Sequence, residues 1–418
     1  MLTTIMGVYS LYVLISIYTS VMQIGYINQA KRKSAVLLSE SQFIVAANYA
    51  ISKERFAIVS AFIEYLIFVA WMGFGLSYLS QNIFFQDVAL MNVVMVMSFV
   101  VINSLISLPF SYYQKFVLDE KFHFNKSTKL QYIKDSAISF VLTLVIGSLV
   151  VWGIYEIMVS FENWWLWSFV FIFGVVIGIN MLFPTVRALF FDKLTPLDDV
   201  ELNTQIKTLM DKTGFTSSGV FISDASKRDS RLNAYFGGLG KTKRVVLFDT
   251  LIKKLTTKEL LAVLGHELGH FAHGDIYKNI TMLGGMLFVM FAIFGNLPEA
   301  LYLQMGLSES PSVVMILLLL FMPVLGFIMM PIMGIVSRSN EYAADKMGSE
   351  LGGPAGAIEL ANALQKLVTE NKSFPLSHPV YIFFHYTHPP VLERLKALGV
   401  DIHGIDKSAL EGTWKEVL

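Results

Sequence analysis

Long apolar runs dominate the pattern of hydrophobic and polar positions, and they predict membrane-spanning helices. A helix needs about 20 consecutive apolar residues to cross a bilayer, and the chain contains seven runs of this kind, of which the sixth is shorter. They are Ile5–Tyr26, Phe56–Leu79, Val88–Leu108, Ser136–Tyr155, Trp164–Leu189, Thr281–Leu297 and Ser312–Val336. The sequence therefore predicts an α-helical polytopic membrane protein with seven spans.

The first run is predicted to remain as a span. A cleavable signal peptide carries Lys or Arg ahead of its apolar core. Here the positive charges Lys31, Arg32 and Lys33 follow the apolar run instead.

Basic residues alternate between the loops and so predict the orientation of the spans. The loops after spans one and three contain Lys31, Arg32, Lys33, Lys53, Arg55, Lys115, Lys121, Lys126, Lys129 and Lys134. The connections at 80–87, 156–163 and 298–311 contain neither Lys nor Arg. The positive-inside rule then predicts an outside N-terminus and an inside C-terminus, with the polar segment after span five on the cytosolic side.

Two polar segments predict a soluble domain that is assembled from separate parts of the chain. Residues 1–189 hold spans one to five, 190–280 a polar insert, 281–336 spans six and seven, and 337–418 the rest of the soluble domain. Within the insert, Gly219–Ile222 and Arg244–Phe248 are short β-rich runs, separated by a segment that contains Asn233–Gly238. They predict a small hairpin in a domain of α+β type.

Composition narrows the chemistry of this chain. Hydrophobic residues make up 54% of the 418 residues and charged residues 15%, which fits a membrane protein. The net charge is zero, so nothing in the balance indicates a nucleic-acid partner. Cysteine is absent. His, Asp and Glu are therefore the only plausible ligands for a metal, and a thiol nucleophile is excluded.

The sequence His266-Glu267-Leu268-Gly269-His270 is the strongest candidate for chemistry. Thr256 and Glu259 form a capping box ahead of an apolar run, which predicts that the motif lies inside a helix. Histidines four residues apart share one helix face and can bind one zinc ion. Glu267 lies about 100° around the helix, where it can activate a water molecule without binding the metal.

A catalytic zinc takes three protein ligands, so a third must come from elsewhere. Glu341 and Asp345 are spaced i, i+4 just past the seventh span and share a helix face. We interpret Glu341 as the ligand and Asp345 as an acceptor that orients a ligating imidazole. The alternative is a solvated acidic helix face, and spacing alone does not separate the two.

These motifs, followed by His388-Pro389-Pro390 and Glu393-Arg394, resemble the integral-membrane zinc metallopeptidases of the type I C-a-a-X prenyl endopeptidase family. Pro109–Thr128, Leu194–Leu197 and Asn233–Phe236 resemble further segments of that family. The resemblance extends over nearly the whole chain.

The resemblance implies one zinc ion held by His266, His270 and Glu341, with Glu267 as general base and acid. It further implies Asp345 beside the ligands, His388 and Arg394 as aids to the oxyanion or substrate, and Asn233 near the bound peptide. The fold it implies is a barrel of seven helices around a water-filled chamber, closed on the cytosolic side by a zincin-like domain. The implied activity is cleavage near the C-terminus of proteins that carry a prenyl group.

Polar residues inside the spans agree with a wet interior. Glu64, Asn103 and Asn180 are costly if they face lipid. For the two asparagines, hydrogen bonding between helices is an equally good interpretation.

Several alternatives stay open from the sequence. One is a quality-control metalloprotease for membrane proteins, and another, of a different class, is a catalytically inactive channel or receptor. Residues 412–418 contain no recognised retrieval signal, which favours a bacterial inner membrane over the endoplasmic reticulum and leaves prenylation of the substrate in question. The oligomeric state is not indicated.

The remaining histidines are predicted to be less important. His273 is interpreted as a rim residue or substrate contact. His123, His385 and His403 are interpreted as structural, and His378 is ranked below His388 because only the latter matches the family context.

Overall fold

The computed structural model describes residues 2–237 and 243–401. Seven of its helices are long and apolar enough to cross a membrane, which confirms the predicted number of spans. They are α1 (Leu2–Ala30), α2 (Glu40–Ala70) continued through a π-helical turn (Trp71–Gly75) into α3 (Leu76–Asn82), α4 (Val88–Tyr113) continued through a second such turn (Gln114–Asp119), α5 (Lys129–Ser160), α6 (Trp164–Phe190), α10 (Asp275–Phe294) and α12 (Pro311–Leu351).

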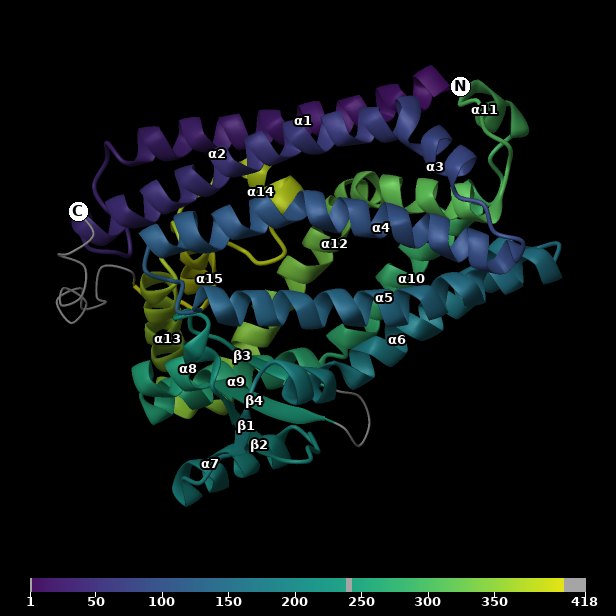
Figure 1. Cartoon of the computed structure of the whole chain (residues 1–418). Helices are drawn as coiled ribbons and strands as arrows, with labels where there is room; N and C mark the ends of the chain where they lie inside the picture. Colours follow the sequence, from purple (N-terminus) through teal and green to yellow (C-terminus); the bar gives the residue numbers. More distant parts are fainter. Residues whose placement is uncertain (1, 238–242, 402–418) are drawn as a thin grey trace.

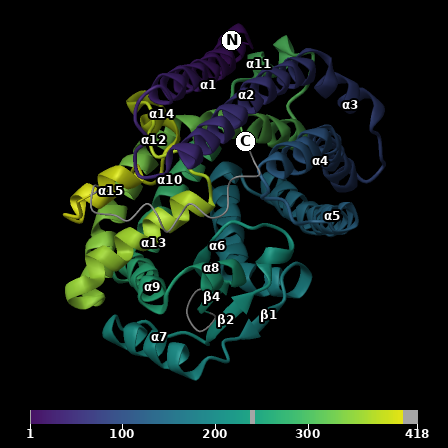
Figure 2. The ribbon, with the colours of Figure 1, turned by 90° about the vertical axis from the view of Figure 1, so that its left-hand side faces the viewer.

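The long helices run lengthwise through the molecule, and a smaller domain gathers at one end of them (Figure 1). Figure 2, turned by 90°, shows the same separation, with the strands, α7 and α8 in the lower part of the picture and α1–α3 in the upper part. The shorter helices are α7 (Val200–Lys212), α8 (Asp249–Lys254), α9 (Thr257–Ala272), α11 (Glu299–Gln304), α13 (Gly356–Glu370), α14 (Pro379–His385) and α15 (Val391–Ala397).

Several helices extend beyond the apolar runs, because capping residues rather than hydropathy set their ends. Ser39 accepts a hydrogen bond from the backbone of Gln42 and forms a capping box at the start of α2, well before the apolar run at Phe56. Thr128 caps α5 in a similar way through Gln131.

A cavity of about 540 Å³ lies between α2, α4 and α12 and is lined by Glu64 and Asn103. Asn103 accepts a hydrogen bond from the indole of Trp71 at 3.3 Å and donates to the carbonyl of Phe99. Asn180 donates to the carbonyl of Val176 in its own helix and is exposed. The polar interior expected at Glu64 and Asn103 is therefore supported, whereas Asn180 does not line this cavity.

The small sheet has four strands in the order β1-β2-β4-β3: β1 (Leu194–Pro196), β2 (Val220–Ser223), β4 (Arg244–Phe248) and β3 (Ala234–Gly237). The predicted hairpin was wrong in its pairing, because β2 and β4 are parallel. The antiparallel partner of β4 is β3, which forms from the segment that we interpreted as a connection. Parallel strands need a crossover rather than a tight turn, and the chain between β2 and β4 supplies it.

The sheet and the helices around it share one apolar core, which fixes α9 against the strands. Val245 and Leu247 of β4 are fully buried, together with Leu264 and Leu268 of α9. Leu264 and Leu268 lie one turn apart and so share one face of α9. This packing holds the histidine-bearing helix rigidly within the domain.

Helix α12 passes from the bilayer into the small domain without a break. Its 41 residues include Pro323 and Pro331, and it carries both Ser312 at the start of the seventh apolar run and Asp345. The proposed division into 1–189, 190–280, 281–336 and 337–418 stays a prediction, and its three boundaries fall inside helices α6, α10 and α12. Part of the last segment, 402–418, lies outside the described residues.

Helices α9 and α12 touch through glycines, so their backbones come very close. A Cβ atom built on Gly348 would lie 2.7 Å from the backbone nitrogen of His266, and one on Gly269 would lie 2.9 Å from the Cα of Ala344. Neither site has a flexible side chain that could move aside. The small residues therefore bring the His266 side of α9 within reach of α12.

We expect Gly348→Ala to push α9 away from α12, because overpacking a well-filled contact costs about 1–3 kcal/mol. The variant should melt at a lower temperature and hold its metal less tightly than the parent chain, as measured by thermal unfolding and metal titration. Gly285→Ala on α10 is the matched control, since nothing lies within 4 Å of its added Cβ. Equal metal affinity in the two variants would contradict the argument.

Candidate metal centre

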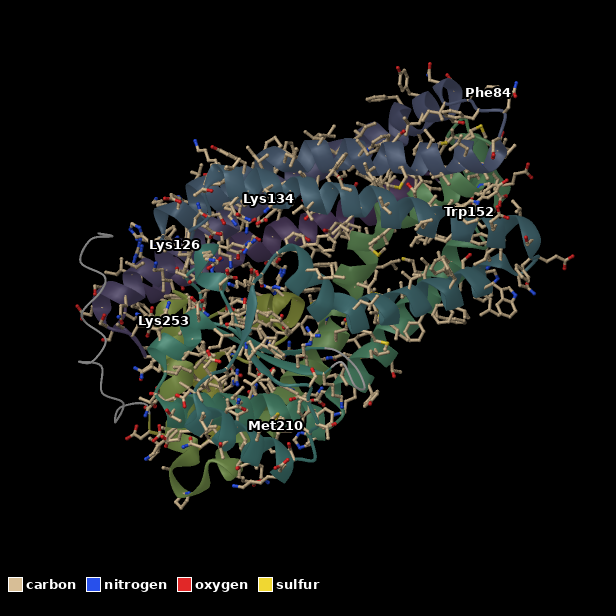
Figure 3. The ribbon with its side chains drawn as sticks, turned by 60° about the horizontal axis from the view of Figure 1, so that its bottom comes forward. Phe84, Lys126, Lys134, Trp152, Met210 and Lys253 are labelled. Atoms are coloured by element: carbon tan, nitrogen blue, oxygen red, sulfur yellow. The ribbon has the colours of Figure 1, made fainter. Side chains whose placement is uncertain are left out.

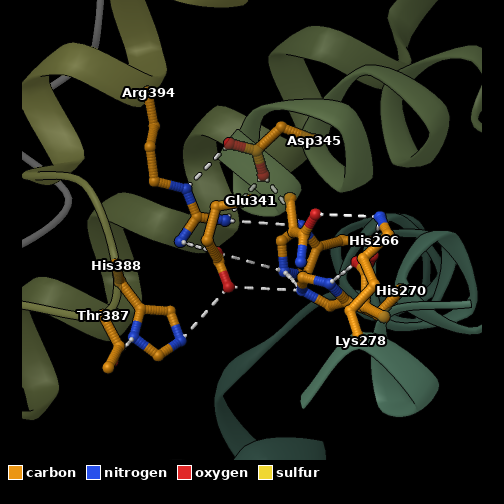
Figure 4. Close-up of polar contacts among 10 residues, drawn as sticks. His266, His270, Lys278, Glu341, Asp345, Thr387, His388 and Arg394 are labelled. Atoms are coloured by element: carbon orange, nitrogen blue, oxygen red, sulfur yellow. Dashed lines mark hydrogen bonds and ion pairs between the residues drawn. The ribbon is translucent and has the colours of Figure 1, made fainter. Parts of the chain in front are cut away.

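The two motif histidines and Glu341 converge on one point (Figure 4). One ligand atom from each of His266, His270 and Glu341 lies within 4.8 Å of the other two. The two Nε2 atoms are 3.2 Å apart, and Glu341 Oε1 is 3.2 Å from the Nε2 of His270. The structure thus brings together the three residues that were predicted as ligands.

Local structure explains why the two rings face the same point. Thr256 and Glu259 form the predicted capping box, with the Thr256 amide donating to Glu259 at 2.7 Å, so α9 begins where the sequence indicates. Both histidines then lie on one face of a regular helix. Glu341 is delivered to that face by α12.

Each ring is held through its other nitrogen. His266 Nδ1 lies 2.8 Å from Asp345 Oδ1, and His270 Nδ1 lies 2.8 Å from Asp275 Oδ2. A carboxylate that accepts the Nδ1 proton leaves the Nε2 lone pair free and turned inward. Asp345 therefore has the position that was predicted for it, and Asp275 is its counterpart on the second ring.

Asp275 was missed in the sequence analysis. It is 3% exposed at the start of α10 and also accepts from the Lys278 ammonium at 2.7 Å. Lys278 in turn donates to Asn340, the neighbour of Glu341, at 3.0 Å. An acidic residue at the first turn of a span, five positions after the motif, was the available signal.

The donor set fits zinc. Tetrahedral zinc, with ligand atoms at about 2.1 Å, separates two of those atoms by roughly 3.4 Å, and the two Nε2 atoms are 3.2 Å apart. Oε2 of Glu341 is buried without a hydrogen bond, although Arg394 Nη1 lies 3.2 Å from it. A buried carboxylate oxygen that accepts no hydrogen bond is the kind of atom that a cation satisfies.

Negative charge is concentrated at this point. Burial lowers the pKa of His270, but its hydrogen bonds with Glu341 and Asp275 outweigh burial and raise that pKa to about 9. The surroundings therefore favour a positive charge at the position where the two rings and Glu341 meet.

Glu267 lies on the neighbouring face of α9 and is half-buried. Among the described residues it forms neither a hydrogen bond nor an ion pair with another side chain. Its charge is nevertheless close enough to raise the pKa of His270. The carboxylate is thus near the convergence point and available to a water molecule or a peptide.

Arg394 and His388 reach the site from the segment after α14. Arg394 is buried and binds Asp345 through two nitrogens, at 2.8 Å and 2.6 Å. His388 directs Nε2 to Oε1 of Glu341 at 3.2 Å, while its side chain is 65% exposed. The predicted roles at the oxyanion or substrate stay predictions, and Arg394 also anchors Asp345 by its geometry.

Asn233 stands outside this group. It is exposed, directly before β3, and its carbonyl accepts from the amide of Phe248. Among the described residues, strand β3 is at the edge of the sheet and pairs with β4. An extended peptide that adds to this edge would pass Asn233.

The other histidines lie elsewhere. His385 Nε2 lies 2.9 Å from the hydroxyl of Thr19, and His378 caps α14. His273 ends α9, and His123 lies in the loop after α4 with a φ of 59°. His403 lies outside the described residues.

We expect Asp275→Asn to weaken zinc binding about 10- to 100-fold, because removing a carboxylate that orients a ligating imidazole has this effect. The ring could then turn, although the ligand atom itself is retained. Competition with a fluorescent zinc chelator measures the affinity. Asp211→Asn on exposed α7 is the control, and an unchanged affinity for Asp275→Asn would show that His270 needs no such partner.

Comparison with known proteins supports a peptidase. Residues 196–400 match the model of peptidase family M48, and residues 23–193 match the model described as CAAX prenyl protease N-terminal, five membrane helices. CAAX prenyl protease 1 of Saccharomyces cerevisiae is 32% identical over 400 residues, covering 86% of each chain. The human CAAX prenyl protease 1 homolog is 31% identical, covering 79% of this chain and 76% of its own.

The fold has a solved counterpart. The crystal structure of S. mikatae Ste24p aligns with a TM-score of 0.84 at 29% identity, covering 95% of this chain and 98% of that one. The likeness therefore includes both the spans and the small domain.

Proposed function

This chain belongs to peptidase family M48 and is a membrane-embedded metallopeptidase of the CAAX prenyl protease kind, and from that premise we propose that it is a zinc endopeptidase. The observation that carries the proposal is the convergence of His266, His270 and Glu341, with a carboxylate behind each ring. A channel or receptor with a relic motif would have no need for this arrangement. That alternative has no observation in its favour.

We propose that His266, His270 and Glu341 hold one zinc ion per chain. When bound, zinc supplies a Lewis acid that makes a water molecule more acidic and polarises a carbonyl. Asp345 and Asp275 accept at the Nδ1 atoms and so keep the two rings turned with Nε2 toward the position of the metal.

Glu267 moves the proton in this proposal. Its free carboxylate takes a proton from the attacking water and returns it to the leaving amine, so it serves first as base and then as acid. Arg394 and His388 each lie 3.2 Å from Glu341 and stabilise negative charge that develops on the carbonyl oxygen. The extended substrate is held on the free edge of β3 beside Asn233.

The proposed substrate is a peptide or protein cut near its C-terminus. The relatives are named for CAAX prenyl processing, and a chain built from seven spans can hold a lipid-modified end beside the zinc. The rival substrate class is a damaged or misfolded membrane protein.

A cleavage assay in detergent separates these substrate classes. It compares a farnesylated C-a-a-X peptide, the same peptide without the prenyl group, and an unfolded membrane protein. Faster cleavage of the farnesylated peptide than of its unprenylated twin supports processing. Equal cleavage of all three substrates supports quality control instead.

We also propose that the active site faces the cytosol, because the basic loops lie on the side of the small domain. We further propose that the seven helices form a barrel around a chamber, and the cavity that Glu64 lines supports this proposal. The identity of the membrane that holds this protein stays a prediction. The sequence favours the bacterial inner membrane, and the eukaryotic relatives favour the endoplasmic reticulum. Accessibility labelling of an engineered cysteine at Lys207 in sealed vesicles tests the orientation.

A further inference from the structure

A basic pocket lies where the helical bundle meets the small domain, on a different part of the molecule from the metal centre. Its volume is about 400 Å³. Basic side chains surround it, and Figure 3 labels two of them, Lys126 and Lys134, at this junction. The basic residues that line it are Lys126, Lys134, Lys193, Lys227 and Arg228.

Three of these charges have no partner. Lys227 is paired with Asp224 at 2.8 Å, and Arg228 is paired with Asp135 at 2.9 Å. Within the described part of the chain, the ammonium groups of Lys126, Lys134 and Lys193 form neither a hydrogen bond nor an ion pair, and all three side chains are exposed. The pocket therefore carries an excess of positive charge.

The backbone beneath the pocket is fixed, so the lysines are presented together. The amide of Lys126 donates to the carbonyl of Arg228 at 3.1 Å, and the amide of Lys193 donates to Asp224 at 2.8 Å. Asp192, which is buried, binds Arg187 of α6 at 2.5 Å. Hydrogen bonds and ion pairs thus join the loop before α5, the end of α6 and the segment after β2 into one wall.

The pocket also adjoins the lipid-facing side of the spans. Leu130 and Ile133 in the first turns of α5 are 77% and 62% exposed, and Leu189 at the end of α6 is 72% exposed. Leu130 shares a helix face with Ile133 at i+3 and with Lys134 at i+4, so the apolar and basic side chains lie next to each other. Apolar side chains at this level contact acyl chains when the helices are in a membrane.

From this combination we propose that the pocket binds the phosphate headgroup of an anionic phospholipid in the leaflet on the side of the small domain. The three unpaired lysines contact the phosphate, while Leu130 and Leu189 contact the acyl chains. Basic pockets between spans favour anionic headgroups in this way. Because the pocket is formed by the bundle and the small domain together, a bound lipid holds the two against each other.

The test is lipid binding by the full chain in a neutral detergent. Native mass spectrometry and thermal unfolding are measured with dioleoyl phosphatidic acid and with dioleoyl phosphatidylcholine, which has the same acyl chains without the net charge. Phosphatidic acid should bind more tightly and raise the melting temperature, and high salt should reduce both effects.

The triple variant Lys126→Ala, Lys134→Ala and Lys193→Ala should lose affinity for phosphatidic acid on the order of a hundredfold, because each basic residue near an anionic lipid contributes about fivefold. The matched control replaces Lys207, Lys212 and Lys258, which are exposed on α7 and α9, with Ala and should bind like the parent chain. Should the triple variant fail to elute as a monodisperse peak, Lys134→Gln alone should still show about a fivefold loss.

Three outcomes would overturn the proposal. The first is equal affinity of the parent chain for the two lipids, and the second is equal affinity of the triple and control variants for phosphatidic acid. The third is protection by inorganic phosphate or glycerol 3-phosphate at the concentration at which phosphatidic acid protects, since that would identify a site for a free anion rather than a lipid.

Discussion

A Glu267→Gln variant is expected to bind one zinc ion per chain and to lose about 10²- to 10⁴-fold in turnover, the range associated with removal of a general base. The amide has nearly the size of the carboxylate, and Glu267 forms no hydrogen bond or ion pair that its replacement would break among the described residues. Metal content by mass spectrometry and single-turnover cleavage of a fluorogenic peptide give the two measurements.

The control for this variant is Glu350→Gln, which changes an exposed carboxylate on α12. It should leave both zinc content and turnover unchanged. Parent-like cleavage by Glu267→Gln would remove the general-base assignment, whereas loss of zinc would show that Glu267 supports the metal site as well.

Glu341→Ala is expected to abolish cleavage and to reduce bound zinc from about one ion per chain to a small fraction, because two imidazoles alone do not complete a catalytic zinc site. The same change removes the acceptor that faces Arg394 Nη1 and His388 Nε2, each at 3.2 Å. Two basic groups then border the position of a divalent cation without the carboxylate that screens them. The expected loss is therefore larger than that for Asp275→Asn.

Dialysis against a chelator followed by titration with zinc measures this loss, with Glu350→Ala as the control. Circular dichroism shows whether the helices persist in the variant. A Glu341→Ala chain that still holds one zinc ion tightly would mean that the carboxylate is not a ligand.

The spans and the metal centre were predictable because their signals are local or charge-based. Apolar run length identifies a span by itself, and the capping box at Thr256 with the i, i+4 histidines specifies a helix and its face without any tertiary information. The position of Glu341 beside the two histidines could be predicted only from the requirement that zinc have a third protein ligand. Its acidic neighbour Asp345 gave the clue, and the resemblance to known peptidases strengthened it.

The sheet and the second carboxylate depend on contacts between distant segments. Short β-rich runs reveal strands but not their partners, so the parallel pairing of β2 with β4 could not be distinguished from a hairpin. Asp275 becomes meaningful only when the start of α10 folds back toward His270, which follows a turn at Gly274 with a φ of 67°. No periodic pattern in the sequence marks that turn as part of the metal site.

Helix α12 links the chemistry mechanically to the bilayer. From Ser312 to Glu341 it extends for roughly 44 Å at 1.5 Å per residue. Helix α9 is packed against it at glycines, so His266, His270 and Glu341 move together when α12 tilts. A tilt of about 2° at its far end then moves the donors by roughly 1.5 Å relative to the other spans, and displacements of this size alter rates strongly. Thinning or stretching of the membrane, which changes helix tilt, should accordingly tune the speed of catalysis while leaving zinc affinity constant.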